Sequence, residues 1–339
     1  MAAFADVLEA RLLNEFQHRF PLVHEPFAAI AATLRADERW VRATLARGQG
    51  DGRVSRVGAV FRPGAIGAST LAALAVPARE LERVAALVSA RPEVNHNYER
   101  EHRYNLWFVA AAPDREALAR TLAAIARATR LQPLVLPMVA DYWIDLGFDL
   151  CAPSAKRAGD LPASRRGPVE LDAAQRRIVA ALEPGLPLVP APFATVAAQA
   201  GVGEADVLTL LADWLAEGVL RRFGVVVRHR ALGYTANAMC VWDVPDGAAD
   251  ALGVALAREP GVTLCYRRVR AAPAWPYNLF CMLHGRDRAT VDGRRAQLVA
   301  AHGLDRFPSA VLYSQRAFKQ CGARYARRDV APADATSPA

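Results

Sequence analysis

The sequence predicts a protein of the α+β class, built as a tandem repeat of a helix-turn-helix (winged-helix-like) domain followed by a ferredoxin-like β-α-β-β-α-β domain. Two observations predict this class. Motifs of the first half return in the second half in the same order, and each half begins with three helical patterns before strands and helices alternate. A chain of 339 residues is long enough to give each half a proper hydrophobic core.

Three pairs of motifs carry the repeat. The segment FPLVHEPFAAIA at residues 20–31 returns as LPLVPAPFATVA at residues 186–197. RVSRVGAVFRPGAIG, which ends at Gly67, returns in GVLRRFGVVVRHRALG, which ends at Gly233. YNLWF at residues 104–108 returns as YNLFC at residues 277–281. A repeat this long indicates a tandem duplication or gene fusion, not a solenoid.

The helical part of each copy comes first. In copy one, apolar residues recur at helical spacing over residues 7–16, 26–34 and 38–46. Pro26 fits the first turn of the second helix, and Asp37 is a suitable N-cap for the third. Two short helices joined by a tight turn after a longer helix describe a helix-turn-helix unit. Copy two repeats the pattern over residues 172–182, 192–200 and 203–216.

The α/β part follows in each copy. In copy one, strand-like runs at residues 54–62 and 70–76 precede a helix at 78–89, strands at 94–100 and 104–111, a helix at 115–129 and a strand at 135–146. Merging the first two runs into one long or bulged strand gives the ferredoxin-like order. The matching elements of copy two are expected at residues 222–244, 248–258, 262–268, 277–284, 287–301 and 310–319.

These patterns predict the domain boundaries. The helix-turn-helix domain spans residues 1–50 in copy one and 169–218 in copy two, and the ferredoxin-like domains span 51–150 and 219–328. A linker rich in Pro, Ser, Gly and charge joins the copies at residues 151–168, and residues 329–339 are expected to form a disordered tail.

Composition excludes several classes of protein. No apolar run approaches the length of a membrane span, and no signal-peptide pattern opens the chain. The five cysteines are odd in number and scattered, without a CxxC pair, so we expect a reduced cytoplasmic protein with no disulfide frame and no metal site of its own. The absence of a GxGxxG motif or P-loop leaves nucleotide binding without support.

The charge of the chain suggests an anionic partner. The net charge is +8, and Lys156 and Lys319 are the only lysines, so arginine carries nearly all of the positive charge. Guanidinium groups bind carboxylates and phosphates bidentately. A nucleic acid and a polyanionic small molecule are therefore both candidate partners.

The order of domains resembles that of the Lrp/AsnC transcription regulators, whose second domain binds small effectors and pairs into dimers. A helix that reads DNA should offer Arg, Lys, Asn or Gln to bases and phosphates. The corresponding helix of copy two carries Glu204, Asp206 and Asp213 and no basic residue, whereas the helix of copy one carries both signs. DNA binding is therefore the lesser hypothesis, with the helical domains retained as a scaffold.

A more specific resemblance is to the siroheme decarboxylases, a branch of the Lrp/AsnC-like architecture that works in heme d1 and alternative heme synthesis. It extends over nearly the whole chain and is carried by FPLVHEPFAAIA, GRVSRVGAVF, VNHNYEREHRYNLWF, GVLRRFGVVVRHRALGY, PYNLF and FKQCGARY. The resemblance implies the fused, two-copy form of the enzyme. It also implies removal of carbon dioxide from two acetate arms of siroheme, at C12 and C18, to give 12,18-didecarboxysiroheme.

The resemblance has consequences for cofactors and partners. It implies no organic cofactor, because the iron tetrapyrrole is the substrate, and it implies that the two α/β domains pair as a pseudo-dimer within the chain. Siroheme is the expected small-molecule partner, a second decarboxylase pair is a further candidate, and neither nucleic acid nor membrane is expected. An Lrp/AsnC-type DNA-binding regulator and a heme-binding regulator are the alternative functions.

The candidate acid–base residues lie in VNHNYEREHRYNLWFVAA, residues 94–111. Loss of carbon dioxide from an acetate arm requires protonation of the remaining carbon by a group that titrates near neutrality, which favours histidine with tyrosine as a helper. Because side chains alternate along a strand, His96, Tyr98 and Arg100 share a face, and His102 and Tyr104 continue that parity if the turn contains no bulge. We expect these two histidines and two tyrosines to be catalytic, with His96 or His102 as an alternative ligand of the substrate iron. The other histidines, His284 among them, show no spacing that suggests a metal site.

A macrocycle ringed by carboxylates requires an apolar slot, aromatic faces and several guanidinium partners. We expect the substrate-binding residues to be Arg56, Arg62, Arg100, Arg221, Arg222, Arg228, His229, Tyr266, Arg267, Arg268, Tyr277 and Lys319. Copy two replaces His96 with Leu264, so copy one is expected to supply the acid–base histidines and copy two mainly carboxylate contacts. The alternatives are a pocket wholly in copy two that uses His229, Tyr266 and Lys319, and an exposed arginine-rich sheet without a ligand.

Overall fold

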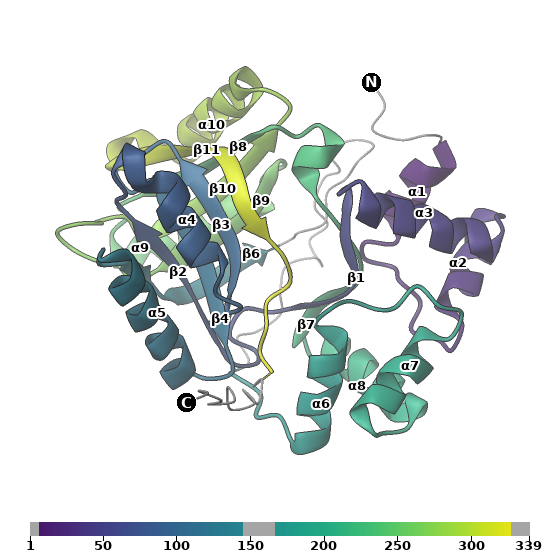
Figure 1. Cartoon of the computed structure of the whole chain (residues 1–339). Helices are drawn as coiled ribbons and strands as arrows, with labels where there is room; N and C mark the ends of the chain where they lie inside the picture. Colours follow the sequence, from purple (N-terminus) through teal and green to yellow (C-terminus); the bar gives the residue numbers. More distant parts are fainter. Residues whose placement is uncertain (1–6, 145–166, 327–339) are drawn as a thin grey trace, which may run out of the picture.

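The computed structural model describes residues 7–144 and 167–326. Figure 1 shows two lobes, a helical lobe that holds the first helices of both copies and a sheet lobe that holds most of the strands. Apart from Gly167 and Pro168, the predicted linker lies outside the described residues, as does the predicted tail.

The helical lobe contains the predicted triplet of helices from each copy. Asp37 accepts hydrogen bonds from the amides of Arg39 and Trp40, so the predicted N-cap is confirmed. Pro26 and Pro192 open equivalent helices, where a missing N–H costs nothing. The helices are α1 (Val7–Glu15), α2 (Pro26–Leu34), α3 (Glu38–Gly50), α6 (Ala173–Leu182), α7 (Pro192–Ala200) and α8 (Glu204–Ala216).

A two-stranded ribbon joins the helical units of the two copies. Strand β1 (Val54–Phe61) pairs antiparallel with β7 (Leu220–Val227), and Gly58 lies opposite Gly224. The amide of Val225 donates to the carbonyl of Phe16 at 2.9 Å, so the end of α1 runs directly over Gly224. A Cβ atom at Gly224 would lie only 2.3 Å from that carbonyl oxygen, which explains the glycine.

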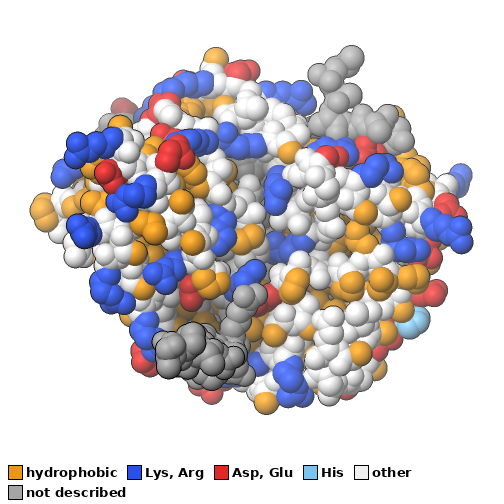
Figure 2. All heavy atoms as spheres, in the orientation of Figure 1, with side chains coloured by type: hydrophobic (Ala, Val, Ile, Leu, Met, Phe, Trp, Pro, Cys, Tyr) orange, Lys and Arg blue, Asp and Glu red, His pale blue; other side chains and the backbone are white. Residues whose placement is uncertain are grey.

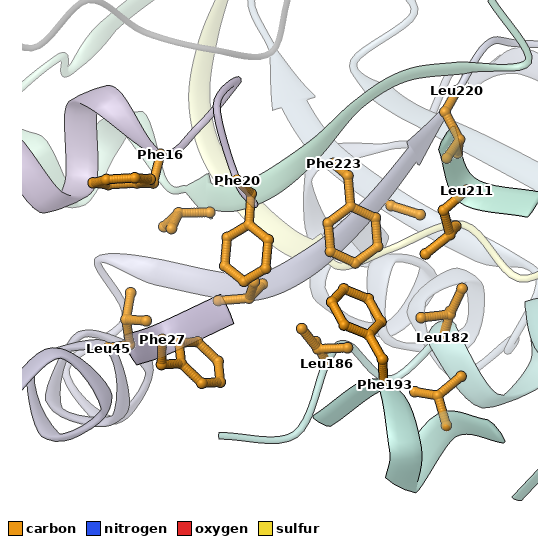
Figure 3. Close-up of a cluster of buried hydrophobic side chains, with 14 of the residues drawn as sticks. Phe16, Phe20, Phe27, Leu45, Leu182, Leu186, Phe193, Leu211, Leu220 and Phe223 are labelled. Carbon is orange, nitrogen blue, oxygen red and sulfur yellow. The ribbon is translucent and has the colours of Figure 1, made fainter. Parts of the chain in front are cut away.

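The helical lobe has one core shared by both copies. Figure 3 shows Phe20 and Phe27 of copy one beside Phe193 and Phe223 of copy two. The ring centroids of Phe20 and Phe223 lie 5.6 Å apart, so aromatic packing crosses the boundary between the copies. The two helix-turn-helix units therefore form one structural body.

The sheet lobe is a closed barrel. Its nine strands follow the order β5-β2-β4-β3-β11-β8-β10-β9-β6. Strands β5 and β6 stand at the two ends of this order, yet only Pro137 separates them in the sequence, so the sheet closes on itself. The strands are β2 (Ala68–Leu74), β3 (Val94–Arg100), β4 (Leu106–Ala112), β5 (Leu134–Leu136), β6 (Met138–Ile144), β8 (Ala236–Trp242), β9 (Val262–Arg268), β10 (Leu279–Gly285) and β11 (Ser309–Gln320).

Each copy gives its last strand to the other. The first part of β11 pairs with β8 of its own copy and the second part pairs with β3 of copy one. In the same way β5 pairs with β2, while β6 pairs with β9 of copy two. The expected intramolecular pseudo-dimer is thus a barrel that neither half can close alone.

Helices cover the outside of the barrel and leave its inside for a site. Apolar residues of the strands alternate between an outer set that packs on the helices and an inner set that includes Trp107, Phe280 and Leu312. These outer helices are α4 (Leu81–Ser89), α5 (Arg115–Thr129), α9 (Asp246–Arg258) and α10 (Arg288–His302).

The repeated YNL motif has a structural role. The side chain of Asn105 accepts from the amide of Val76 and donates to its carbonyl, both at 2.9 Å. Asn278 makes the same pair of bonds with Val244. Each asparagine therefore fastens the end of β2 or β8 to the neighbouring hairpin.

The predicted merging of the first two strand runs is wrong in both copies. Residues 62–67 form a turn between β1 and β2, with Gly64 and Gly67 at positive φ. In copy two the chain between β7 and β8 contains η3 (His229–Leu232). The first strand of each copy leaves the barrel and pairs in the ribbon, and the ferredoxin-like order begins at β2 and β8.

No helix within residues 7–144 and 167–326 is long and apolar enough to cross a membrane.

The close approach at Gly224 yields a stability prediction. Replacement Gly224→Ala should destabilise the fold by roughly 1–3 kcal/mol, because the new methyl group overlaps backbone atoms of Phe16 and Gln17. Gly293→Ala is the control, since its Cβ would meet nothing within 4 Å on an exposed face of α10, and it should stabilise by about 0.5–1 kcal/mol. Urea denaturation of both variants measures the difference. Equal effects of the two changes would contradict the packing described for the ribbon.

Candidate functional site

A large cavity opens where the barrel faces the ribbon. Figure 2 shows the surface hollowed between the two lobes, with Lys and Arg side chains along the hollow. Inner side chains of the barrel line it together with residues of β1 and β7 and with the segment that follows β11. The described lining contains three arginines, Arg56, Arg100 and Arg268, but only one acidic residue, Glu183. The cavity is therefore apolar overall and positively charged.

The central hairpin of copy one supplies its polar face. His96, Tyr98 and Arg100 of β3 line the cavity, as their shared parity predicts. The ring centroids of His96 and Tyr98 lie 6.0 Å apart with 28° between the planes. Between them, Asn97 points to the other side of the sheet and donates to the carbonyl of Ala85 on α4. One face of β3 thus packs against α4, and the other face lines the cavity.

His96 is neutral in the ligand-free protein. Burial within the barrel, followed by the charge of Arg56, lowers the pKa of His96 to about 4. His96 lies in the cavity wall and keeps a small exposed surface there. Burial also raises the pKa of Tyr98 to about 12, so its hydroxyl keeps its proton.

Arg100 and Arg268 occupy equivalent positions in the two copies. Arg100 donates to the carbonyl of Leu312 at 3.0 Å, and Arg268 donates to that of Leu136 at 2.7 Å. Each side chain is 6% exposed, and each leaves a buried Nε atom without a hydrogen-bond partner. Burial lowers the pKa of Arg100 to about 10, so both the desolvation and the charge favour an incoming anion.

Arg56 is the third arginine of the cavity. Its Nη2 atom donates to the carbonyl of Ala59 at 3.1 Å, and burial lowers the pKa of its guanidinium. Within the described residues, Arg56, Arg100 and Arg268 form no ion pair with a carboxylate. A buried arginine without a carboxylate partner is well suited to bind a carboxylate of a ligand.

His284 is a cavity residue that the sequence reasoning missed. Its Nε2 atom lies 2.6 Å from Nδ2 of Asn237, and its Nδ1 atom lies 2.8 Å from the hydroxyl of Thr263. Strand parity could have predicted this position, because every second residue of β10 (Phe280, Met282 and His284) faces the inside of the barrel. His284 was not predicted because it lies near the end of the strand, where the alternating pattern stops.

The two copies contribute unequally to the cavity. In the strand pairings, His96 corresponds to Leu264 and His284 corresponds to Ala111. Arg100 of β3 bonds Asn237 of β8, which contacts His284 of β10. Arg100 also lies 5.7 Å from the ring of Tyr98, which stacks with His96, so the histidine of each copy belongs to one composite group. Strand β9 of copy two also contributes Tyr266 and Arg268, with the Arg268 guanidinium 4.6 Å from the tyrosine ring.

His102 and Tyr104 lie outside the described cavity lining. The residues between β3 and β4 form a turn, so the strand parity does not continue through it. The imidazole of His102 packs 5.3 Å from Trp275, which in turn packs 5.0 Å from Trp107 in the cavity wall. Burial and the charge of Arg103 lower the pKa of His102. Tyr277 packs on the same tryptophan at 5.0 Å, also beyond the lining.

Several predicted substrate contacts lie elsewhere in the fold. Lys319 faces α4 and donates to the carbonyls of Ser89 and Arg91, both at 2.8 Å, because the pairing of β11 with β3 shifts register beside it. Arg222 donates to the carbonyl of Gln17 in the helical lobe. These two residues hold neighbouring elements in place and lie outside the described cavity lining.

Three more arginines of the prediction are engaged outside the described lining. Arg62 donates to the carbonyls of Gly218 and Gly167, and Arg221 forms an ion pair with Asp141. Arg267 faces α9 and lies 3.5 Å from Asp250. Arg228 follows the end of β7 and adds positive charge near Tyr98.

His229 lies in η3, and its side chain is outside the described part of the structure. The alternative prediction from the sequence was a site wholly in copy two, formed by His229, Tyr266 and Lys319. Of these, Tyr266 lines the cavity and Lys319 does not.

The helix that would read DNA packs against the other copy in each half. Glu204 at the start of α8 lies 2.7 Å from His24 of copy one. Arg42 of α3 donates to the carbonyl of Leu188 of copy two at 3.4 Å and pairs with Glu38 on its own helix. Arg42 is thus engaged within the protein, and α8 presents a carboxylate, which would repel phosphate, at its start.

The chain matches two families, each once in either half. The family described as siroheme decarboxylase NirDL-like HTH domain matches residues 9–53 and 175–221. The AsnC-like ligand binding domain family matches residues 65–142 and 231–319. The matches follow the duplication of the chain.

Relatives are similar over nearly the full length. The siroheme decarboxylase NirDL subunit of Paracoccus pantotrophus is 47% identical over 94% of this chain and 97% of its own length. The siroheme decarboxylase of Hydrogenobacter thermophilus is 33% identical over 93% of this chain and 94% of its own length. The separate siroheme decarboxylase NirD subunit of Stutzerimonas stutzeri is 53% identical but covers 44% of this chain, and 98% of its own length.

Two crystal structures are similar to the whole fold. The siroheme decarboxylase NirDL aligns with a TM-score of 0.66 at 30% identity, over 94% of both chains. A second structure, of siroheme decarboxylase NirDL with an iron-uroporphyrin III analogue, aligns with a TM-score of 0.65 at 30% identity and the same coverage.

The burial of His96 gives a prediction for the ligand-free protein. We expect His96 to titrate with a pKa of about 4 by NMR of histidine-labelled protein. Arg56→Met should raise this pKa only in part, because burial is the larger cause, and Arg62→Met should leave it unchanged, because Arg62 lies outside the described cavity lining. A pKa near 6.5 for His96 in the wild-type protein would contradict the burial described.

The same shift predicts a pH dependence of stability. Because the folded pKa of His96 lies below its ordinary value of 6.5, the unfolded chain binds more protons between about pH 6.5 and pH 4. This contribution to stability is complete above pH 6.5 and is lost as the pH falls towards 4. Urea denaturation across this range should show a weaker pH dependence for His96→Gln than for the wild-type protein.

Proposed function

Since the chain belongs to the siroheme decarboxylase family, we propose that it removes carbon dioxide from the acetate arms at C12 and C18 of siroheme, giving 12,18-didecarboxysiroheme. The chain is an enzyme, a carboxy-lyase of heme d1 biosynthesis. Each turnover at one arm converts a CH2–COO⁻ group and one proton into a methyl group and one carbon dioxide. The two arms together therefore consume two protons and need neither oxidant nor organic cofactor.

One observation carries the proposal. A single cavity, mostly apolar, combines three arginines that have no carboxylate partner among the described residues with two histidines from different copies. A carboxylate-ringed macrocycle requires such cationic anchors, and the loss of carbon dioxide requires a proton donor close to one of its arms.

The arginines would hold the arms that do not react. Arg100 and Arg268 lie on equivalent strands in the two copies, so they can bind carboxylates at different edges of one flat ligand. Leu71, Val109 and Met239 offer apolar surface between the polar groups. An acetate held against such surface loses solvation as an anion, which favours its conversion into neutral carbon dioxide.

The histidines would supply the protons. His96 is neutral in the ligand-free cavity, and the negative charges of the incoming substrate would favour its protonated form. His96 would thus take up a proton when the substrate binds, and its protonated ring would lie beside the arm that reacts. Tyr98 keeps its hydroxyl proton and can donate a hydrogen bond to the same arm.

A test separates this function from a regulatory one. Anaerobic incubation of the protein with siroheme, followed by mass spectrometry, should show the loss of two carbon dioxide molecules. A DNA shift assay with genomic fragments serves as the parallel measurement. Tight, salt-sensitive DNA binding without turnover would favour the Lrp/AsnC-type regulator, and tetrapyrrole binding without either would favour a heme-binding regulator.

The position of the hairpin residues predicts unequal effects of its two histidines. His96→Gln should lower kcat at least about 100-fold, because it removes a general acid from the cavity. His102→Gln should retain most of the activity, because its ring lies behind Trp275. A larger loss in His102→Gln than in His96→Gln would overturn the assignment. If His96 instead binds the substrate iron, the absorption spectrum of bound siroheme will change in His96→Gln.

Neighbouring arginines on β9 test the carboxylate anchors. Arg268→Met should raise KM for siroheme about 10–100-fold, because a charge-assisted hydrogen bond in a buried site contributes roughly 1.5–3 kcal/mol. Arg267→Met is the matched control, since Arg267 faces α9 on the opposite side of the same strand, and its KM should stay close to that of the wild-type enzyme. Steady-state kinetics that give equal KM values for the two variants would exclude Arg268 as an anchor.

A further inference from the structure

Arg228 lies beside the opening of the cavity. It follows Val227, the last residue of β7 and part of the cavity lining, where the ribbon meets the barrel. Its side chain is half-buried and lies outside the described lining. Burial raises the pKa of Tyr98 to about 12, and the charges of nearby arginines, Arg228 and Arg230 among them, oppose this rise. Arg228 is therefore close enough to act electrostatically on a group inside the cavity.

The duplication supplies a reference for Arg228. Arg62 and Arg228 are separated by the same interval as the paired glycines of the ribbon, so the two arginines are equivalent. The amide of Arg62 donates to the carbonyl of Val219 at 2.9 Å, and the amide of Arg228 donates to the carbonyl of Arg53 at 2.8 Å. Their backbones are thus held alike, and the difference between them arises in the side chains.

The two side chains are used differently. Arg62 donates to the carbonyls of Gly218 and Gly167, both at 3.1 Å. The guanidinium of Arg228 instead extends over Gly52, where a Cβ atom would lie 3.4 Å from its Nη1 atom. Among the described residues, the Arg228 side chain has no hydrogen-bond acceptor and no carboxylate partner, and its Nε atom is buried. One copy thus uses this arginine to hold the fold, and the other copy keeps its charge available.

Arg230 adds a second charge at the same place. Its guanidinium donates to the carbonyl and the hydroxyl of Ser314 at 2.8 and 2.9 Å and to the carbonyl of Gln315 at 3.2 Å, so β11 fixes its position. In the described part of the chain it forms no ion pair with a carboxylate. Burial lowers the pKa of Arg100 to about 10, and the charge of Arg230 acts in the same direction. Arg228 and Arg230, the entrance arginines, are therefore electrostatic neighbours of the cavity.

We propose that the entrance arginines form a capture site, which attracts a polycarboxylate macrocycle to the cavity and accelerates its association. Arg228 makes the first contact with a carboxylate, and Arg230 supplies a fixed charge beside it. The inference rests on the proposed function for the identity of the ligand, siroheme. It gives Arg228 a role in the rate of binding, distinct from the role of Arg100 and Arg268 as anchors.

Exposure separates the two roles. Charges on the rim of a cleft attract an anion that approaches through solvent, and they raise association rates in a manner that salt screens. A half-buried guanidinium keeps part of its hydration, so its contact with a carboxylate adds little to the final affinity. Arg100 and Arg268 are each 6% exposed, and contacts of such desolvated groups govern dissociation. Arg228 therefore determines how fast the ligand arrives, and the anchors determine how long it stays.

Stopped-flow fluorescence of the full chain with zinc uroporphyrin III measures both steps. This probe is a fluorescent tetrapyrrole octacarboxylate, and its association and dissociation rate constants, kon and koff, are measured at about 20 mM and about 0.5 M salt. In Arg228→Met, kon should fall about 3–10-fold at low salt, while koff stays within about 2-fold of the wild-type value. At high salt the two kon values should agree, because the screening length falls below about 5 Å.

Three further variants separate capture from other effects. Arg127→Met is the matched control, because it removes the same charge from an exposed position of α5 on the outside of the barrel, and kon should stay close to that of the wild-type protein. Arg228→Lys keeps the charge without the planar guanidinium, so kon should also be nearly unchanged. Arg268→Met should raise koff and leave kon unchanged, because it removes an anchor.

An unchanged kon in Arg228→Met at low salt would overturn the inference. An equal loss of kon in Arg127→Met would also reject it, because net charge alone would then explain the effect. A higher koff in Arg228→Met with an unchanged kon would make Arg228 an anchor instead, and failure of the probe to bind would count against capture as well. The rate constants do not depend on turnover, so the expected values in a protein that releases no carbon dioxide from siroheme would reject the proposed function alone.

Discussion

Closure of the barrel is the constraint on which the rest of the structure depends. A sheet of two ferredoxin-like halves has free edges, and each copy removes an edge of the other with its own last strand. The inner face of the closed sheet is then hidden from water except where the barrel meets the ribbon. Polar residues on that face are buried without being packed by helices, which is how arginines and histidines come to share an interior.

Near-symmetry of the backbone permits asymmetry of the chemistry. Equivalent residues hold equivalent places, as Arg100 and Arg268 do on the carbonyls of Leu312 and Leu136. The duplication therefore supplies two similar halves of a cavity, and a few substitutions make them different. Each copy has a cavity histidine at a position where the other copy has leucine or alanine, while both copies keep the cationic group.

Sequence patterns predicted most elements and part of the site. The repeat and the two periodicities located the helices and strands, and parity along β3 correctly grouped His96, Tyr98 and Arg100. Parity failed at the turn that carries His102, where the backbone leaves the strand conformation. The strand exchange pairs residues more than one hundred positions apart, and local sequence patterns do not predict such pairing.

The pairing of Gln320 with His96 also has a consequence for the synthesis of the chain. Domains tend to fold as they leave the ribosome, and the first α/β unit emerges long before residue 320. Until β11 has been synthesised, β3 can pair only with β4, and its other edge stays unpaired. The cavity is thus completed only when the end of the second copy has been translated, so a nascent chain has no finished site in which to sequester a tetrapyrrole.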